Sequence, residues 1–469
     1  MHVMKLGSIY LIKKNVTMKM LLLCLVMYFS ISFACETDLD CSLNGACMNG
    51  VCDCDAAWKG DQCHELYQLP TSVTGDIKVE NVSTWGAGTL QNKVDGKFHL
   101  YAAEFVGNCG VTTWLTNSQV VRYTASVPSG PWAREEVVLP VWGHCASTAL
   151  APNGTVILWA LNGKQTPKSG TDAWGNACEG GASPCGFAKH GCGPDAPPLP
   201  NVTNPVDRAA RPTHEELMEM KEHNQEQDDS SLSFFVSPDG PAGPWKLVQT
   251  EIKGTASGSL YAPWIMPNGT TFWVIQTDCP SQFPKNESGR CGTVLRAETW
   301  EGPYEILSDG ACSLGEDHSI YVDKRGVHCM THRFSDVSDP DGKYASANDG
   351  GHAFSVDGRD PWYCADGKGG VEVCSYSSPI AYNSTIIYEK DGVNKFGTRE
   401  RPHMLFDGEI PVALTSSVQH CQDPGIPDAC VEGDIHSCNA TNLMACKNQW
   451  PGYHDRSWTA VTPLRTSKD

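Results

Sequence analysis

Positive charge is scarce in this sequence. Its 35 Lys and Arg residues face 54 Asp and Glu residues, which gives a formal net charge of −19 at pH 7. A chain with this excess of negative charge is repelled by phosphate backbones and by anionic lipid surfaces. We therefore expect no nucleic-acid partner.

Long apolar runs are missing as well. The longest, at residues 20–33, is shorter than the roughly 20 residues that a membrane span needs, and no later stretch exceeds it. Lysines precede this run, and small residues at positions 32 and 34 lie just before Cys35. The pattern predicts a signal peptide over residues 1–34 and a secreted, extracellular protein without a membrane span. An uncleaved anchor is the alternative if Met1 is the true start.

Three groups of motifs are also absent: a Gly-rich phosphate loop, a Gly-x-Ser-x-Gly nucleophile elbow and a His-Glu-x-x-His zinc helix. Each would place a specific chemistry on the chain. Without them the sequence gives no support to a nucleotide-dependent enzyme or an esterase, and we expect no cofactor.

Cysteine, by contrast, is abundant. The chain has 22 cysteines, and removal of the segment that holds Cys24 leaves 21. This usage is typical of an oxidising compartment, and the odd number leaves at least one cysteine without a partner in the chain. Asn-x-Ser/Thr acceptor sites, which are typical of exposed loops in glycoproteins, occur at Asn81, Asn153, Asn201, Asn268, Asn286, Asn383 and Asn439.

Six of the cysteines fall within residues 35–66, with one residue between the fourth and the fifth and eight between the fifth and the sixth. Together with Trp58 and Gly60, this spacing resembles an EGF-like module. The resemblance implies three disulfides, Cys35–Cys47, Cys41–Cys52 and Cys54–Cys63. A module of this size buries too little apolar surface to fold without such bridges.

The loop between the second and fourth cysteines of this module is short and lacks the Asp/Asn-plus-aromatic pattern of calcium-binding EGF-like modules. We therefore expect no calcium there. The module is either a protein-binding unit or a rigid spacer, and the sequence favours neither.

One sequence motif recurs between residues 67 and 469. A turn with Gly after Asp, Asn or Arg, followed by a short strand, occurs around Gly96, Gly154, Gly269, Gly326 and Gly408. Asp-Gly and Asn-Gly favour tight hairpins, because both central residues of a type I′ turn need a positive φ. A second motif, Gly-Pro or Asp-Pro followed by an aromatic residue, lies between most of these hairpins.

The repeat spans about 55 to 60 residues, since Gly96 and Gly154 are 58 positions apart. This length matches a four-stranded propeller blade. Where two successive repeats lie farther apart, the chain carries an insertion between them. The largest insertion is a Cys- and Pro-rich segment at about 164–230. We predict an all-β chain in which a five-bladed β-propeller follows the small module, with residues 455–464 closing the ring. A β-sandwich is the structural alternative.

The innermost strand of each predicted blade faces the central channel, so the residues just before each hairpin are candidates for a site. Two of these strands carry charge where a buried strand is normally apolar. Glu316 and Asp317 lie in the fourth, and Arg399, Glu400 and Arg401 lie in the fifth. Burial of such groups is unfavourable in free energy, so we expect them to be paired with opposite charges or to take part in the function.

At these residues the chain resembles the five-bladed propellers of glycoside hydrolase family 43 and its arabinanase and β-fructosidase relatives. The resemblance rests on residues 315–332, 349–358 and 399–408, together with His144. It extends over about 71–464 and implies a polysaccharide or glycan as the partner.

Hydrolysis of this kind needs one protonated carboxyl group to donate to the leaving oxygen and one ionised carboxylate to activate water from the opposite face. Glu316 is the candidate acid, because the adjacent carboxylate of Asp317 should raise its pKa. The resemblance implies a base on the first inner strand and a further Asp on a middle one, but residues 85–92 and 258–265 contain no carboxylate. The remaining candidates for the base are Glu104, Asp317 and Glu400.

The empty Asp positions support a second hypothesis, a non-catalytic matrix or adhesion protein whose propeller binds a glycan and whose small module binds a protein. Under both hypotheses Arg399 and Arg401 would hold hydroxyl or acidic groups of the sugar. A purely structural alternative is an ion-pair network of Glu400 with its two flanking arginines.

Further candidate substrate contacts are His144, His352, Trp85 and Trp114, since flat rings stack well on sugars. Several histidines lie near the inner strands, but their spacings match no short metal motif and we predict no metal site. They are His144, His318, His328, His332, His352 and His403.

Overall fold

The computed structural model describes residues 35–79, 82–105, 111, 114, 118–139, 143–162, 230–256, 258–278, 290–332, 349–374, 379–390, 392–396, 398–419 and 457–467. The predicted signal peptide and residues 164–229 of the predicted insertion lie outside these ranges, so both stay predictions.

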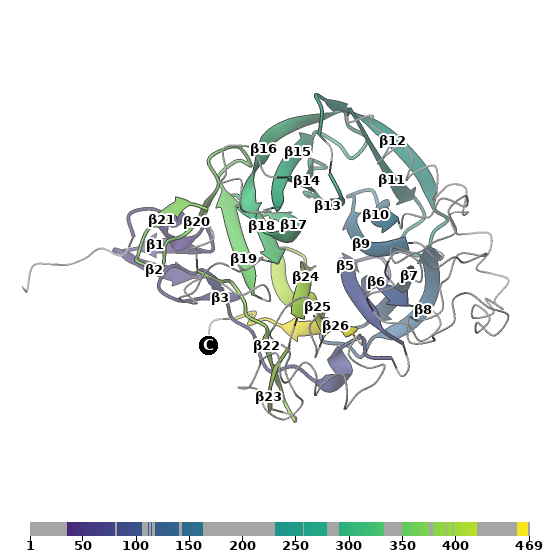
Figure 1. Cartoon of the computed structure of the whole chain (residues 1–469), viewed down its shortest axis with the longest axis horizontal. Helices are drawn as coiled ribbons and strands as arrows, with labels where there is room; N and C mark the ends of the chain where they lie inside the picture. The colour runs from purple at the N-terminus through teal and green to yellow at the C-terminus, as the bar shows by residue number, and fades with distance from the viewer. Residues whose placement is uncertain are drawn as a thin grey trace, which may run out of the picture.

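Nearly all of the described chain is β-structure, arranged as five antiparallel meanders around one axis (Figure 1). The first meander contains β5 (Thr84–Asn92), β6 (Lys97–Phe105), β7 (Ser118–Ala125) and β8 (Ala133–Leu139). The second contains β9 (Gly143–Leu150), β10 (Val156–Asn162), β11 (Ser231–Ser237) and β12 (Lys246–Lys253). The third contains β13 (Leu260–Ile265), β14 (Thr271–Asp278), β15 (Arg290–Ala297) and β16 (Tyr304–Leu314).

The fourth meander contains β17 (Glu316–Val322), β18 (Val327–His332), β19 (Gly350–Ser355), β20 (Tyr363–Ala365) and β21 (Val371–Val373). A two-stranded hairpin follows, made of β22 (Thr385–Tyr388) and β23 (Gly392–Lys395). The fifth meander contains β24 (Thr398–Asp407), β25 (Ile410–Gln419) and β26 (Ser457–Pro463). The first strands of the five meanders contact one another in a ring, in the order β5, β9, β13, β17, β24 and back to β5. The prediction of an all-β, propeller-like chain is confirmed.

The repeated glycine turns explain why each meander starts as a hairpin. All five predicted turns connect the first two strands of a meander. Gly96, Gly154, Gly269 and Gly408 have φ between 63° and 94°, a region that side-chain-bearing residues rarely adopt. The second motif, Gly-Pro or Asp-Pro followed by an aromatic residue, also has the same conformation each time. The peptide bond before the proline is cis at Pro131, Pro244, Pro303 and Pro361.

The ring is closed by the segment that precedes β5. Ile77 and Gln68 form antiparallel bridges to Thr459 and Leu464, so this segment runs along β26. The buried carboxylate of Asp76 holds it there by accepting hydrogen bonds from Tyr388 Oη (2.6 Å), Trp458 Nε1 (3.1 Å) and the backbone N–H of Val461 (3.0 Å). The prediction that the C-terminal stretch forms a closing strand therefore agrees with the pairing observed.

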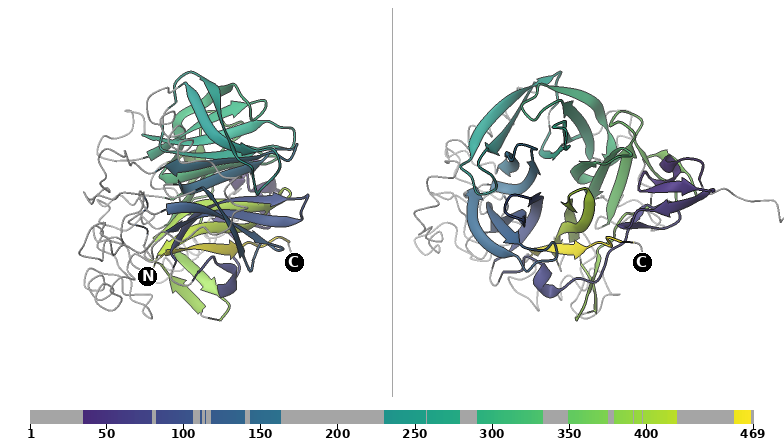
Figure 2. Two further views of the ribbon diagram at one scale, coloured as in Figure 1. Left: turned by 90° about the vertical axis from the view of Figure 1, so that its right-hand side faces the viewer. Right: turned by 180° about the vertical axis from the view of Figure 1, so that it is seen from behind.

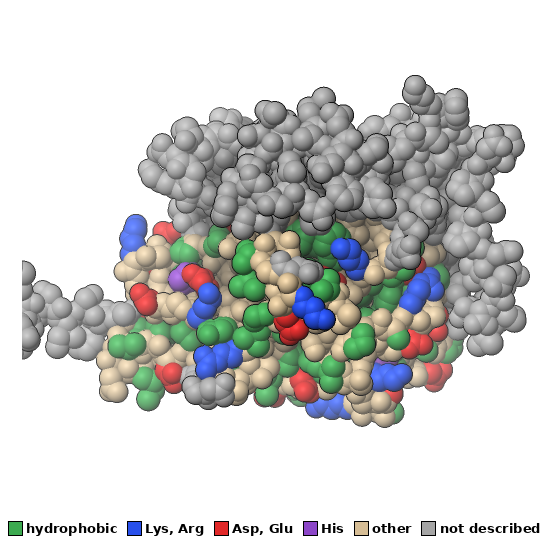
Figure 3. Space-filling model, turned by 90° about the horizontal axis from the view of Figure 1, so that it is seen from below, with side chains coloured by type: hydrophobic (Ala, Val, Ile, Leu, Met, Phe, Trp, Pro, Cys, Tyr) green, Lys and Arg blue, Asp and Glu red, His purple; other side chains and the backbone are tan. Residues whose placement is uncertain are grey.

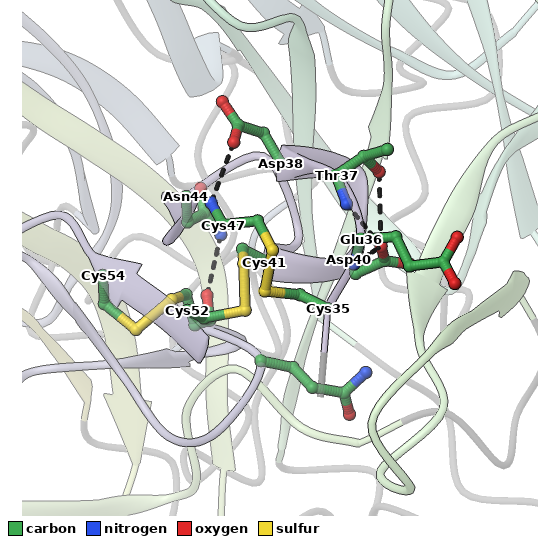
Figure 4. The surroundings of a disulfide bond; sticks show 12 residues. Cys35, Glu36, Thr37, Asp38, Asp40, Cys41, Asn44, Cys47, Cys52 and Cys54 are labelled. Carbon is green, nitrogen blue, oxygen red and sulfur yellow. Dashed lines mark hydrogen bonds between the residues drawn. A yellow bond between two sulfur atoms is a disulfide. The ribbon is translucent and has the colours of Figure 1, made fainter. Parts of the chain in front are cut away.

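The N-terminal module is small and rich in turns. It contains the 3-10 helix η1 (Asp38–Cys41) and the strands β1 (Gly45–Met48), β2 (Val51–Cys54), β3 (Trp58–Lys59) and β4 (Glu65–Leu66), and a second 3-10 helix, η2 (Val73–Gly75), follows it. The three implied disulfides are present as predicted. Figure 4 shows how closely they cluster, with the Asp38 carboxylate accepting the backbone N–H of Cys47 at 2.9 Å.

The module packs against the side of the fourth meander, next to β19, β20 and β21 (Figures 1 and 2). One buried apolar cluster contains Trp58 and Leu66 of the module together with Tyr321, Met330 and Tyr382 of the large domain. The backbone N–H of Leu66 also donates to the carbonyl of Ala381 at 2.8 Å. The module is therefore joined to the propeller by a continuous core.

Basic and acidic side chains alternate with apolar ones over the described part of the face drawn in Figure 3. Within the described ranges, no helix has the length and apolar character required to cross a membrane.

Candidate functional site

Four of the five innermost strands carry the same irregularity in their pairing, close to the first residue of the strand. The register shifts between Trp85 and Gly88 in β5, between His144 and Ser147 in β9, between Glu316 and Ser319 in β17, and between Glu400 and His403 in β24. Each shift is a β-bulge, which bends a strand and re-aims its side chains.

The second residue of every bulge has a left-handed backbone. The φ values are 60° at Gly86, 48° at Cys145, 61° at Asp317 and 58° at Arg401. A positive φ is uncommon for a residue other than glycine and costs of order 1–3 kcal/mol, so such residues gather at functional sites. Here the bulges turn three non-glycine side chains towards the axis.

A polar pocket lies at this end of the axis, and all five innermost strands contribute to its lining. The lining residues are Gly86, Ala87, Cys145, Ala146, Ser147, Leu260, Tyr261, Asp317, His318, Arg401 and His403. Sequence reasoning singled out Asp317 and Arg401 as site residues and His318 and His403 only as nearby histidines. It missed Cys145, Ser147 and Tyr261, although Cys145 could have been found by aligning the inner strands with one another.

An ion pair forms part of the wall of this pocket. Arg401 Nε lies 3.1 Å from Asp317 Oδ1, and the backbone N–H of Arg401 donates to Asp317 Oδ2 at 3.3 Å. The side chain of Asp317 is only 1% exposed, and the amide oxygen of Gln276 accepts its backbone N–H at 2.6 Å. Gln276, which sequence reasoning also missed, therefore fixes the bulge that aims Asp317.

Two further carboxyl groups flank the ion pair. Burial, followed by repulsion from Asp317 and Glu400, raises the pKa of Glu316 to about 7. Burial and the Asp317 carboxylate raise the pKa of Glu400 to about 8. The predicted effect of Asp317 on Glu316 therefore has the right sign, but loss of hydration is the larger cause.

Two further titratable groups of the pocket lining, Cys145 and His403, are neutral at pH 7. Burial raises the pKa of Cys145 to about 12, so this residue is a thiol and not a reactive thiolate. Burial and the nearby Arg401 lower the pKa of His403 to about 4. Arg401 thus carries a permanent positive charge in the pocket lining.

One group of side chains could hold a metal ion. His332 Nδ1 lies 3.9 Å from Asp317 Oδ2, and His332 Nε2 lies 4.0 Å from Glu400 Oε1. One ligand atom from each of these three residues lies within 4.8 Å of the others. Two carboxylates and an imidazole suit a divalent transition metal. However, the Arg401 guanidinium beside Asp317 already neutralises one of the two ligand charges.

Glu104, a candidate base, lies away from the pocket. Its carboxylate is bound by Arg134 through Nε (2.8 Å) and Nη2 (2.9 Å), and it accepts hydrogen bonds from Tyr123 and Gln119. The side chain is 5% exposed, so all of its hydrogen-bonding capacity is used within the first meander. The structure does not bring Glu104 to the other candidate carboxylates.

Arg399 also points away from the pocket. Its guanidinium donates to Ser416 Oγ, Gln68 Oε1 and Thr462 Oγ1, and to the carbonyls of Asn383 and Thr385, at 2.8 to 3.2 Å. The side chain is fully buried. This arginine joins the fifth meander to the closing segment. The predicted ion pairs of Glu400 with Arg399 and Arg401 are not among the described contacts, since Arg401 pairs with Asp317 instead.

The three predicted substrate contacts of the first and second meanders, Trp85, Trp114 and His144, form a separate cluster. His144 Nδ1 lies 2.8 Å from Ser118 Oγ, and its ring lies 5.4 Å from Trp114. Trp85 is buried against Phe105 and Cys145. Burial holds the pKa of His144 well below its usual range. This cluster lies behind the pocket lining.

The N-terminal module can be assigned by comparison. A family model described as the Teneurin-like EGF domain matches residues 37–65. The three observed disulfides have the pairing implied by the resemblance to EGF-like modules. This segment is an EGF-like domain.

Several solved structures that resemble the chain are glycoside hydrolases. A thermostable family-43 glycoside hydrolase has 9% identity, covers 86% of this chain and 94% of its own, and has a TM-score of 0.42. The family 117 glycoside hydrolase Zg3597 from Zobellia galactanivorans has 10% identity, coverages of 88% and 94%, and a TM-score of 0.41. The exo-β-1,3-galactanase of Phanerochaete chrysosporium has 9% identity, coverages of 85% and 64%, and a TM-score of 0.38.

His352, the last predicted contact, lies at the boundary between the EGF-like domain and the propeller. Its ring lies 4.7 Å from that of Trp58, and its Nδ1 atom lies 3.4 Å from Asn44 Nδ2. It is buried and does not line the axial pocket. The structure thus gathers Asp317, Arg401, Glu316 and Glu400, and leaves the other predicted residues elsewhere.

Proposed function

We propose that this protein is an extracellular glycan-binding protein, in which the axial pocket holds sugar hydroxyl groups without cleaving the glycan. The observation that carries the proposal is the Asp317–Arg401 pair. Asp317 Oδ1 and Arg401 Nε are buried in the pocket wall, and their contact does not have hydrogen-bond geometry. A buried donor and a buried acceptor side by side match a hydroxyl group, which both donates and accepts.

The charges in the pocket support binding over hydrolysis. Hydrolysis needs an ionised carboxylate facing a protonated one across the substrate. Glu316 and Glu400 both have a raised pKa, and Asp317 is paired with Arg401. Of these three carboxyl groups, Asp317 is paired with Arg401, Glu400 is mostly protonated at pH 7, and Glu316 is protonated about half of the time.

A secreted glycosidase is the second candidate, and one observation favours it. The pKa of Glu316 is raised to about 7. A general acid works best when its pKa lies near the operating pH. In this alternative Glu316 would be the acid, and Glu400 or Asp317 would be the base.

Retention on immobilised glycans and release of reducing sugar, measured together, test both candidates. Neutral and acidic polysaccharides are presented to the wild-type chain and to Arg401→Gln, Asp317→Asn and Glu316→Gln, with Arg296→Gln as the control. Arg296 forms a partly exposed ion pair on the outer surface of the third meander. We expect retention by the wild type and control, about tenfold weaker retention by Arg401→Gln, and no sugar release.

Sugar release that Glu316→Gln abolishes would replace the binding proposal with the hydrolase. Equal retention of all four variants would place the glycan outside this pocket and contradict both candidates.

Secretion is proposed on the disulfides and the EGF-like domain, which are typical of extracellular proteins. The segment 1–34 would then be absent from protein collected in the medium, whose first residue should be Cys35. N-terminal sequencing of that protein checks the cleavage site, and a chain that still begins at Met1 would contradict it.

A further inference from the structure

A chain of buried polar groups crosses the boundary between the EGF-like domain and the fourth meander. Asp323 Oδ1 lies 3.2 Å from His328 Nε2, His328 Nδ1 lies 3.1 Å from His352 Nε2, and His352 Nδ1 lies 3.4 Å from Asn44 Nδ2. His328 is fully buried and His352 is 5% exposed. The chain ends in the EGF-like domain, where Asn44 Nδ2 also donates to the carbonyl of Cys63 at 3.0 Å.

These contacts assign one proton to each imidazole. The Asp323 carboxylate, 3.2 Å from His328 Nε2 without hydrogen-bond geometry, favours a proton on that nitrogen, which leaves His328 Nδ1 to accept from His352 Nε2–H. His352 Nδ1 then has no proton and accepts from the Asn44 amide. Rotating the Asn44 amide would place its oxygen against the Cys63 carbonyl, so Asn44 is held as a donor.

A second proton on His352 does not fit this arrangement. It would sit on Nδ1 and face the Nδ2–H of Asn44, which puts two donors against each other. The charge would also be buried between two aromatic rings, since His352 packs on Trp58 and Phe354. Desolvation by burial, with repulsion from His328, accordingly holds the pKa of His352 well below its usual value.

The surrounding charges do not offset this penalty. Arg325, in the turn between β17 and β18, pairs with Asp55 and lies 3.6 Å from Asp38, both of the EGF-like domain. Asp323 is in contact with His328 and accepts backbone N–H groups of its own turn. His64, in the EGF-like domain, is a further group that disfavours a positive charge on His352.

We propose that docking of the EGF-like domain on the propeller is pH-dependent, because His352 can be protonated only when the two parts separate. His352 binds a proton near pH 6.5 when exposed, but resists it when docked. The contribution of His352 to the free energy of docking is therefore complete above about pH 6.5 and is lost as the pH falls below that value. Mild acid loosens the domain, and neutral pH restores it.

The expected size follows from proton linkage. Each pH unit below 6.5 weakens docking about tenfold per titrating group, so one histidine gives about 30-fold between pH 7.4 and pH 5.0. The domain should therefore open more often in acid without unfolding the propeller.

Amide hydrogen exchange on the full chain measures this opening. The N–H of Leu66, which donates to the Ala381 carbonyl, is the reporter, and amides between β6 and β7 serve as an internal reference. After correction for the intrinsic pH dependence of exchange, we expect Leu66 to exchange about 30-fold faster at pH 5.0 than at pH 7.4. An unchanged corrected rate in the wild type contradicts the proposal, whatever the variants do.

Two variants test the assignment to His352. His352→Gln cannot take up a proton, so its Leu66 rate should change less than threefold between the two pH values. Asn44→Asp should reverse the trend, because a carboxylate would accept from a doubly protonated His352. The matched control is His99→Gln, which removes an equally buried histidine of the first meander. A full 30-fold response in His352→Gln, or its loss in His99→Gln, would overturn the assignment.

Discussion

Arg399 offers the sharpest test of how the ring is closed. Its guanidinium makes five hydrogen bonds at 2.8 to 3.2 Å to the fifth meander, to the segment before β22 and to Gln68. Hydrogen bonds from a charged donor contribute roughly 1.5–3 kcal/mol each, and an acceptor left unpaired by the loss of its donor costs about 1–3 kcal/mol.

The two hydroxyl acceptors, Ser416 and Thr462, and the side-chain amide of Gln68 can rotate towards other partners, whereas the two backbone carbonyl acceptors cannot. We therefore expect Arg399→Met to lower the free energy of unfolding by about 4 kcal/mol. Arg399→Lys keeps the charge but has three donors in place of five, so we expect a loss of about 2 kcal/mol.

Urea denaturation under non-reducing conditions measures both values, and glycan retention is measured on the same samples below the transition. Arg296→Met is the control, because an exposed ion pair contributes little. The reasoning is refuted if Arg399→Met costs less than about 1 kcal/mol, or if it abolishes glycan retention while stability is unchanged.

Two further changes probe the buried carboxyl groups. The raised pKa of Glu400, about 8 against 4.5, means that the folded state keeps a proton that the unfolded chain releases, so stability falls as the pH rises from about 4.5 to 8. Thermal unfolding should therefore show Glu400→Gln gaining stability over the wild type at pH 8 and not at pH 4, with the exposed Glu298→Gln unchanged; a variant that loses stability at pH 8 contradicts this. Asp76→Asn turns an amide N–H₂ group towards donors and should lower the free energy of unfolding, measured by urea denaturation, by about 2 kcal/mol. An unchanged free energy of unfolding would show that Asp76 does not hold the closing segment.

The fold could be predicted largely because turns are local. The Asn-Gly and Asp-Gly pairs marked the hairpins, and four of those glycines have the positive φ that the turn type needs. The three disulfides were predicted because the cysteine spacing resembles that of EGF-like modules, and the bridges span only 9 to 12 positions.

The site was predicted less well, because the bulges break the alternation of the strands. In a regular strand Arg399 and Arg401 would face the same side. The bulge at Glu400 and Arg401 separates them, so Arg401 reaches the axis and Arg399 faces the closing segment. No glycine marks the bulge at Cys145, Asp317 or Arg401, and tertiary contacts such as that of Gln276 with Asp317 hold at least one of them.

The position of His352 depended on a contact that sequence could not provide. The pattern placed it near an inner strand, and β19 is in fact the third strand of its meander. Its partner Asn44 is 308 positions away in the EGF-like domain. Only the docking of the two parts makes this histidine a boundary residue.

The most direct test of the central claim is a crystal structure of the mature chain with an oligosaccharide from the glycan that retains it. We predict that a sugar hydroxyl group lies within hydrogen-bond distance of both Asp317 Oδ1 and the Arg401 guanidinium, with the glycosidic bonds intact. A sugar bound only to the EGF-like domain or to the outer strands, with the Asp317–Arg401 pair untouched, would contradict the account.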